Sequence, residues 1–120
     1  MKGEIMENCL FCKIIRGEIP SQKVFEDDEI LAFNDISPAA QIHILVIPKK
    51  HIASLFAAED ADSAMLGRLL IKAQKIAKEK SAGGFRLIAN TEKIGGQEVP
   101  HLHFHILGGE KPIGKMVSND

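Results

Sequence analysis

The sequence predicts an α+β fold in which one long and one short helix cover an antiparallel sheet. Short apolar runs separated by hairpin-length links are typical of antiparallel strands, and the chain shows no regular alternation of strands and helices. A single long stretch, from Asp60 to about Lys80, has helical spacing. With 120 residues we expect one domain, with short tails at 1–8 and 108–120.

The first elements are short. "LFCKIIRGEIP" (10–20) predicts a short helix, with apolar residues on one side and a glycine and a proline at its end. "KVFEDDEILAFND" (23–35) contains two extended runs joined by an acidic turn, which predicts a β-hairpin. "IHILVIP" (42–48) is a β-branched run that stops at Pro48, and this is typical of a central strand.

The second half of the chain begins with the long amphipathic helix at 60–80, which we expect Gly83 and Gly84 to end. "FRLIAN" (85–90) predicts the next strand, "TEKIGGQEVP" (91–100) a glycine-containing loop, and "HLHFHIL" (101–107) the last strand.

Composition excludes several classes of partner. Fifteen basic and sixteen acidic side chains leave a formal charge of -1, so the chain lacks the field that binds long nucleic acids. Its apolar runs are too short to span a membrane, and the N-terminus mixes charges into its first apolar residues. We therefore expect a cytoplasmic protein without nucleic-acid or membrane partners.

The "HLHFHIL" segment holds three of the five histidines, at alternate positions. On a strand His101, His103 and His105 would share one face, with neighbours roughly 6.6 Å apart. The intervening apolar residues would pack under the long helix on the other face. These residues are Leu102, Phe104 and Ile106. Three histidines in register favour a metal site or chemistry on an anion over a strand whose polar face happens to be histidine.

Chemistry on phosphorus explains the neighbouring sequence better than a metal does. A neutral imidazole can attack a phosphoryl group and form a covalent intermediate that water later cleaves. Because Ile94 through Leu107 contain no Lys or Arg, backbone N–H groups would have to bind the anion. Gly95 and Gly96 allow the chain to turn and approach a phosphate, although such a pair alone is usually only a turn.

At these residues the sequence resembles the histidine triad superfamily. "HLHFHIL" matches its His-φ-His-φ-His-φ-φ signature, where φ is apolar, and "FNDISP", "HILVIPKKHI" and "GGQ" resemble its Hint branch, the nucleoside phosphoramidases. The resemblance implies a homodimer in which two sheets join into one continuous sheet. It also implies a hydrolase that cleaves the P–N bond of nucleoside 5′-phosphoramidates of the AMP type through a nucleotidyl-histidine.

The resemblance assigns roles to individual residues. His103 would be the nucleophile, His105 would bind the phosphate, and His43 would hydrogen-bond and orient the nucleophile. The remaining nucleotide contacts would come from Asp35 on the ribose hydroxyls, Phe33 and Ile36 around the base, and Asn90, Gly96 and Gln97 around the phosphate.

Each of these roles has a plain structural alternative. Asp35 precedes Ser-Pro, where an aspartate often serves only as a turn residue. Phe33 and Ile36 are apolar and could simply be core residues. His43 lies within an apolar strand, and a lone strand histidine is often a hydrogen-bonded polar group of the core.

Two cysteines three positions apart, Cys9 and Cys12, have metal-pair spacing, and histidines would have to complete a four-ligand zinc site. His51 and His101 are the candidates. Zinc-binding relatives in the superfamily carry a similar cysteine pair with matching histidines, so the resemblance points to these four residues and a structural Zn²⁺. The alternatives are two half-buried thiols on a helix, or a redox pair, which lacks the usual βαβ context.

Two features differ from the Hint pattern. Glu98 stands at the leaving-group side of the nucleotide site, where Hint proteins usually carry a small hydroxyl residue, and a carboxylate there would repel a phosphate unless protonated or turned away. The chain also lacks the tryptophan of the Hint C-terminal segment. Two alternatives therefore stay open: a dinucleoside polyphosphate hydrolase of the Fhit type, and a nucleotide-binding or scaffold protein with little catalysis.

Overall fold

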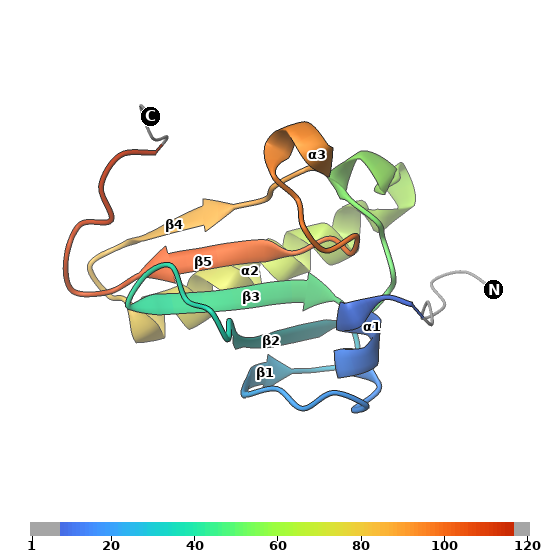
Figure 1. Ribbon diagram of the computed structural model, residues 1–120, viewed down its shortest axis with the longest axis horizontal. Coiled ribbons are helices and arrows are strands. Elements are labelled where there is room, and N and C mark those ends of the chain that lie inside the picture. The colour runs from blue at the N-terminus through green and yellow to red at the C-terminus, as the bar shows by residue number, and fades with distance from the viewer. Residues whose placement is uncertain (1–7, 117–120) are drawn as a thin grey trace.

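A five-stranded antiparallel sheet forms the centre of the protein (Figure 1). The structure is a computed structural model that describes residues 8–116. The strand order is β1-β2-β3-β5-β4. The strands are β1 (Lys23–Glu26), β2 (Ile30–Asn34), β3 (Ile42–Pro48), β4 (Phe85–Ile88) and β5 (Phe104–Gly108). The predicted α+β class, the hairpin and the central position of the "IHILVIP" strand are confirmed.

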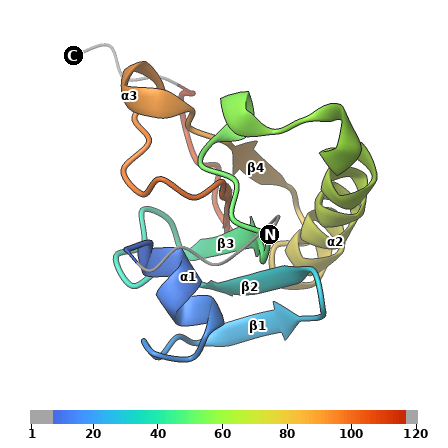
Figure 2. The same ribbon diagram turned by 90° about the vertical axis from the view of Figure 1, so that its right-hand side faces the viewer.

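Helices lie on both faces of the sheet, with α1 on one side and α2 on the other (Figure 2). The helices are α1 (Leu10–Ile15), α2 (Ser63–Lys80) and α3 (Glu92–Gly95), and two 3₁₀ turns cover Leu55–Ala57 and Asp60–Asp62. Residues 60–62 belong to a 3₁₀ turn and not to the long helix. None of the helices among the described residues is long and apolar enough to cross a bilayer.

The helices α1 and α2 each cover an apolar layer of the sheet. The α2 layer contains Leu69, Ala73 and Ile76 from the helix and the alternate residues Leu102, Phe104 and Ile106 from the last strand region. The α1 layer packs against the opposite face of β2 and β3. Because β2 and β3 are covered on both faces, nearly all their residues are buried, as their continuous apolar sequence predicts.

The last strand is shorter than predicted, because β5 begins at Phe104 and leaves 101–103 outside the ladder. In the register that pairs Val46 with Phe104, Pro48 would lie opposite Leu102. Proline has no N–H to donate, and the carbonyl of Pro48 instead accepts a hydrogen bond from the His101 ring. The side chains still alternate, so the predicted two faces survive the loss of the ladder. β5 includes Gly108, the first residue of the expected C-terminal tail.

The prediction of a loop throughout 91–100 is wrong, because this segment contains the short helix α3. Gly96 ends this helix in a left-handed conformation with φ of 86°. The side-chain oxygen of Gln97 accepts the N–H of Glu92 at the helix start, at 2.8 Å. Threonine before Glu92 and glycine after the last turn are helix-boundary signals that the sequence already contained.

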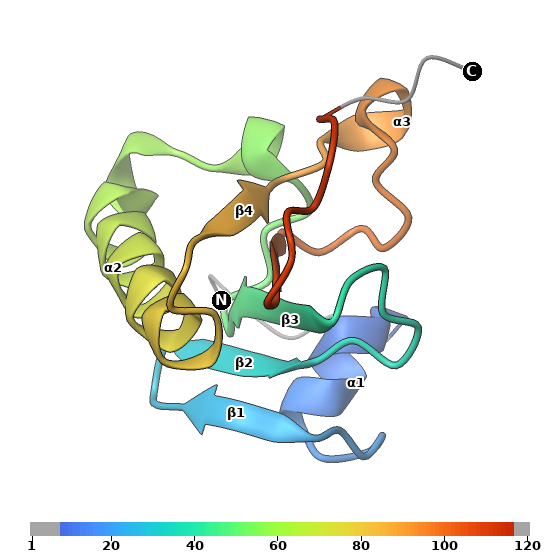
Figure 3. The same cartoon turned by 90° about the vertical axis from the view of Figure 1, so that its left-hand side faces the viewer.

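The long helix ends at Lys80, before the expected glycines, and the backbone N–H of Ser81 caps it. After β5 the chain turns and passes beside β4 (Figure 3). Arg86 on β4 contacts this segment, because its guanidinium donates to the carbonyls of Gly114 and Lys115. Most of the expected N-terminal tail (1–7) and the last four residues of the C-terminal tail (117–120) lie outside the described residues.

Candidate active site

The three alternate histidines lie on the sheet face opposite α2. His101 and His103 are buried, and His105 is half-buried. The rings of His103 and His105 are 5.0 Å apart between centroids. Their apolar neighbours belong to the α2 layer, so the alternation read from the sequence places polar and apolar side chains on the expected faces.

A hydrogen bond to a backbone carbonyl fixes the tautomer of His103. Its Nδ1 lies 2.7 Å from the carbonyl oxygen of His101, and because a carbonyl can only accept, Nδ1 carries the proton and donates. A neutral His103 therefore has its lone pair on Nε2, for which residues 8–116 provide no hydrogen-bond partner. An imidazole in this state can act as a nucleophile.

His43 on β3 fixes the tautomer of His105, the last member of the row. The N–H of Ala39 donates to His43 Nδ1 at 2.9 Å, so a neutral His43 carries its proton on Nε2. That Nε2 lies 2.9 Å from His105 Nδ1, which must accept. His105 in turn keeps its proton on Nε2, the atom that remains for a ligand. His43 therefore lies against the histidine row, but its hydrogen-bond partner is His105, whereas the resemblance implied a bond to His103.

Asp35, in the turn after β2, faces the same pair. One carboxylate oxygen accepts the N–H of Ser37 at 2.8 Å. Asp35 therefore acts as a turn residue, which is the structural alternative that the sequence suggested. The other oxygen lies 3.4 Å from His43 Nε2. Burial lowers the pKa of His43, and the nearby Asp35 carboxylate opposes that shift. Asp35 therefore both shapes the turn and places a negative charge beside the histidines.

The two residues expected around the base lie in different surroundings. Phe33 is buried in the α1 layer, whereas the side chain of Ile36 is 96% exposed. Phe11 of α1, which sequence reasoning missed, packs edge-on against Phe33 at 5.6 Å and against His103 at 5.1 Å. Its position between the two cysteines was visible, but only the packing of α1 on the sheet shows that its ring contacts the histidine row.

The glycine loop precedes the histidine row, as expected, but its amides are engaged. The N–H of Gly96 donates to the Lys93 carbonyl at 3.0 Å, and the N–H of Gln97 donates to the Glu92 carbonyl at 3.1 Å. A phosphate at these two amides would have to share or replace the bonds that close α3. Asn90 is half-buried after β4, and the side chain of Glu98 is exposed at the surface.

The Gln97 side chain holds the loop in place. Its amide nitrogen donates to the carbonyls of Ala53 and Val99, at 2.7 and 2.9 Å, while its oxygen accepts the N–H of Glu92. The carboxylate of Glu92, a non-glycine residue with φ of 61°, accepts the hydroxyl of the buried Ser54 at 2.6 Å. Sequence reasoning missed the hydrogen bond between Ser54 and Glu92, because these two residues are far apart in the chain.

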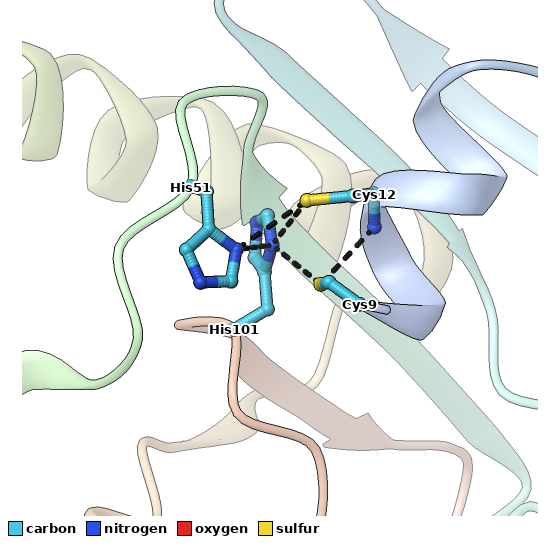
Figure 4. Close-up of side chains that lie close together, drawn as sticks. All are labelled: Cys9, Cys12, His51 and His101. Carbon is cyan, nitrogen blue, oxygen red and sulfur yellow. Dashed lines mark hydrogen bonds between the residues drawn. The ribbon is translucent and has the colours of Figure 1, made fainter. Parts of the chain in front are cut away.

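A second cluster lies beside the row, where Cys9, Cys12, His51 and His101 meet (Figure 4). The four ligand atoms lie within 4.8 Å of one another. His101 Nδ1 is 3.3 Å from Cys9 Sγ and 3.2 Å from His51 Nδ1, and Cys12 Sγ is 3.3 Å from His51 Nδ1. The structure thus brings together all four residues that the sequence nominated.

The donor set fits a zinc ion. A tetrahedral zinc with Zn–N of about 2.0–2.1 Å and Zn–S of about 2.3 Å has ligand-to-ligand edges of roughly 3.3–3.8 Å. His101 Nε2 donates to the Pro48 carbonyl at 2.8 Å, which leaves the Nδ1 lone pair toward the cysteines. Burial lowers the pKa of His101 to about 4, so its ring is neutral at pH 7, as a metal ligand must be.

A known family model matches most of this chain. Residues 16–112 match the HIT domain. The chain belongs to the HIT family. The matched range includes His43 and the whole histidine row of this HIT protein and begins after the two cysteines.

Several relatives resemble this HIT protein over most of their length. Protein HitA of Neisseria gonorrhoeae is 50% identical over 104 residues, covering 86% of this chain and 97% of HitA. The purine nucleoside phosphoramidase of Escherichia coli is 46% identical over 115 residues, covering 94% of this chain and 96% of that protein. The crystal structure of a HIT family hydrolase from Legionella pneumophila superposes with a TM-score of 0.84 at 52% identity, covering 89% of this chain and all of that one.

The buried histidines of this HIT protein predict a pH-dependent stability. Burial lowers the pKa of His105 to about 4 from 6.5, and His103 and His43 lower it as well. Between these two pH values the unfolded chain binds more protons than the native one. The contribution of His105 to the free energy of unfolding should therefore be fully present above about pH 6.5 and be lost as the pH falls toward about 4. Urea unfolding at about pH 5 and pH 7 measures this difference. The difference should be smaller in His105→Asn, and an unchanged difference would contradict the assignment.

Proposed function

We propose that the protein hydrolyses nucleoside 5′-phosphoramidates through a covalent nucleotidyl-histidine on His103. The observation that supports this most directly is the His103 Nδ1–H bond to the His101 carbonyl, which leaves the Nε2 lone pair without a partner among the described residues. The 46% identity to a protein named purine nucleoside phosphoramidase supports a purine nucleotide such as AMP, or its phosphoramidate, as the ligand.

The reaction has two steps at the same nitrogen. His103 Nε2 attacks the phosphorus, the P–N bond breaks, and the amine leaves with a proton taken from solvent. Water then attacks the phosphorus and gives up a proton to solvent, the P–Nε2 bond breaks, and the nucleoside monophosphate is released. His103 returns to its neutral form, with Nδ1–H still bonded to the His101 carbonyl.

The neighbouring residues supply charge and orientation. His105 Nε2–H, left available by the hydrogen bond from His43, donates to a phosphoryl oxygen where negative charge develops. His43 keeps His105 in that tautomer, and Asp35 accepts hydrogen bonds from the ribose hydroxyls with its carboxylate. The other nucleotide contacts are Phe33 and Ile36 at the base, Asn90, Gly96 and Gln97 near the phosphate, and Glu98 on the leaving-group side.

We also propose that Cys9, Cys12, His51 and His101 hold a structural Zn²⁺. A four-ligand site without an open position links α1 to the segments after β3 and before β5, and supplies folding energy and not a reactant. Cysteine thiols must stay reduced to remain zinc ligands, and this requirement agrees with the cytoplasmic location expected from the sequence.

We expect a homodimer formed through β4, which lies at one edge of the sheet. An exposed edge offers unpaired N–H and C=O groups, and Phe85 and Leu87 on β4 are 39% and 37% exposed. Sedimentation should give a dimer at micromolar concentration. Leu87→Lys should shift it to monomer, whereas Lys23→Glu on the opposite edge strand should not. A wild-type monomer at that concentration would contradict the proposal.

The proposed reaction is tested by intact mass after brief mixing with adenosine 5′-phosphoramidate. We expect an increase equal to one adenylyl group, followed by its loss as AMP accumulates. Turnover of a dinucleoside polyphosphate, measured in parallel, should be much slower. Faster turnover of the dinucleoside polyphosphate would favour an Fhit-type hydrolase, and no turnover of either with retained AMP binding would favour a nucleotide-binding protein.

A further inference from the structure

One aromatic ring contacts both the cysteine–histidine cluster and the histidine row. Phe11, between the two cysteines on α1, is buried. Its ring lies edge-on to the ring of His101, with centroids 6.0 Å apart and an angle of 69°. It also lies edge-on to the ring of His103, with centroids 5.1 Å apart and an angle of 89°. A cluster residue and the proposed nucleophile therefore pack against the same side chain.

A second connection between the two sites runs through His101 itself. Its ring Nδ1 lies among the cluster atoms, and its ring Nε2 donates to the Pro48 carbonyl. Its backbone carbonyl accepts the Nδ1–H of His103 at 2.7 Å. Any shift of the His101 backbone moves the acceptor on which the tautomer of His103 depends.

The helix that carries Phe11 is too short to hold its own position. α1 has six residues, and isolated helices of this length are unstable in water. Cys9 caps its first turn, because Cys9 Sγ accepts the N–H of Cys12 at 3.3 Å. The cluster and the α1 core layer therefore determine where the Phe11 ring lies.

We propose that Phe11 is a positioning residue for His103, and that the cysteine–histidine cluster sets this position through α1 and the His101 carbonyl. The inference rests on the proposed role of His103. The hydrogen bond fixes Nδ1, while Phe11 and His105 pack on the ring and oppose its rotation about the Cβ–Cγ bond. Together they keep Nε2 pointed at the position where the phosphorus would bind. The cluster thus acts on the reaction without touching the substrate.

The experiment uses Phe11→Leu in the zinc-loaded protein, with Phe25→Leu as the matched control. Phe25 is half-buried on β1 and packs in the α2 layer, away from both sites. Imidazole ¹⁵N shifts of His103 report its tautomer, and rapid mixing with adenosine 5′-phosphoramidate reports the rate of adduct formation. In wild type we expect one tautomer with a protonated Nδ1. In Phe11→Leu we expect shifts averaged between tautomers and adduct formation slower by about 10- to 100-fold.

The same ¹⁵N shifts test the contribution of the cluster. Removing zinc from the wild-type protein with a chelator should move the His103 shifts in the direction of Phe11→Leu, at a temperature where the protein remains folded. If metal removal lowers only the melting temperature and leaves these shifts unchanged, the cluster is purely structural and that part of the proposal is overturned.

Wild-type shifts and adduct rate in a folded Phe11→Leu protein would overturn the positioning role of Phe11. If that variant does not fold, Phe11→Met, whose unbranched and flexible side chain adapts better to the shape of the site, replaces it and the same two results decide. Failure of the proposed function is a separate result: wild type would form no adduct, while the ¹⁵N shifts would still respond to Phe11→Leu and not to Phe25→Leu.

Discussion

Replacing His103 with alanine should abolish the nucleotidyl adduct and reduce phosphoramidate turnover by several orders of magnitude. The proposed covalent bond forms at Nε2 of this ring, and no other neutral imidazole in the row combines a free lone pair with a backbone-fixed tautomer. Intact mass and steady-state turnover with adenosine 5′-phosphoramidate measure the two effects. Loss of a nucleophile differs from loss of a binding group because the rate falls while affinity persists.

AMP affinity provides the control for this variant. Asp35, Asn90 and the glycine loop remain in His103→Ala, so AMP should still bind, with a Kd within about tenfold of wild type. Phe25→Leu, in the other core layer, should keep both the adduct and the turnover. A His103→Ala protein that still hydrolyses the phosphoramidate near the wild-type rate would falsify the mechanism.

The second large effect is expected for the cysteines. Cys9→Ser should lower the melting temperature by more than about 10 °C, because losing a metal ligand removes roughly 3 kcal/mol or more, and 1 kcal/mol corresponds to about 4 °C in a domain of this size. Turnover well below the melting temperature should decrease far less than in His103→Ala. Thermal unfolding and metal analysis of freshly purified protein measure these quantities.

Chelation separates the metal from the side chain itself. A chelator should lower the melting temperature of wild type to near that of Cys9→Ser and leave the variant almost unchanged. Adding zinc back should restore only the wild type. Freshly purified protein without zinc, together with a normally melting Cys9→Ser variant, would contradict the zinc assignment.

Periodicity along the chain was sufficient to predict the long helix and the two faces of the last strand. The alternation in "HLHFHIL" separates histidines from apolar residues on any extended segment, and helical spacing from Met65 to Ala77 predicts one apolar stripe. Both patterns are local properties of the chain, so they survive in the folded protein. The resemblance to the histidine triad superfamily, carried by short motifs, nominated the four cluster residues before any distance was known.

Element ends and hydrogen-bond partners depended on contacts between distant segments. The last ladder begins at Phe104 because the opposite strand ends in a proline, and α3 forms where a glycine and the Gln97 side chain close it. His43 bonds His105 and not His103, which follows from the register of β3 against β5. A one-residue change of register would alter this pairing without altering either strand's own pattern.

The protonation states are the clearest case of information that only packing supplies. The sequence contains five histidines of identical chemistry. Their differences arise from single partners: the Ala39 N–H on His43, the His101 carbonyl on His103, and the Pro48 carbonyl on His101. Each partner accepts or donates one proton and thereby decides which ring nitrogen keeps its lone pair. Spacing along the chain can bring histidines to one face, but hydrogen bonds across the fold determine which ring nitrogen donates and which keeps its lone pair.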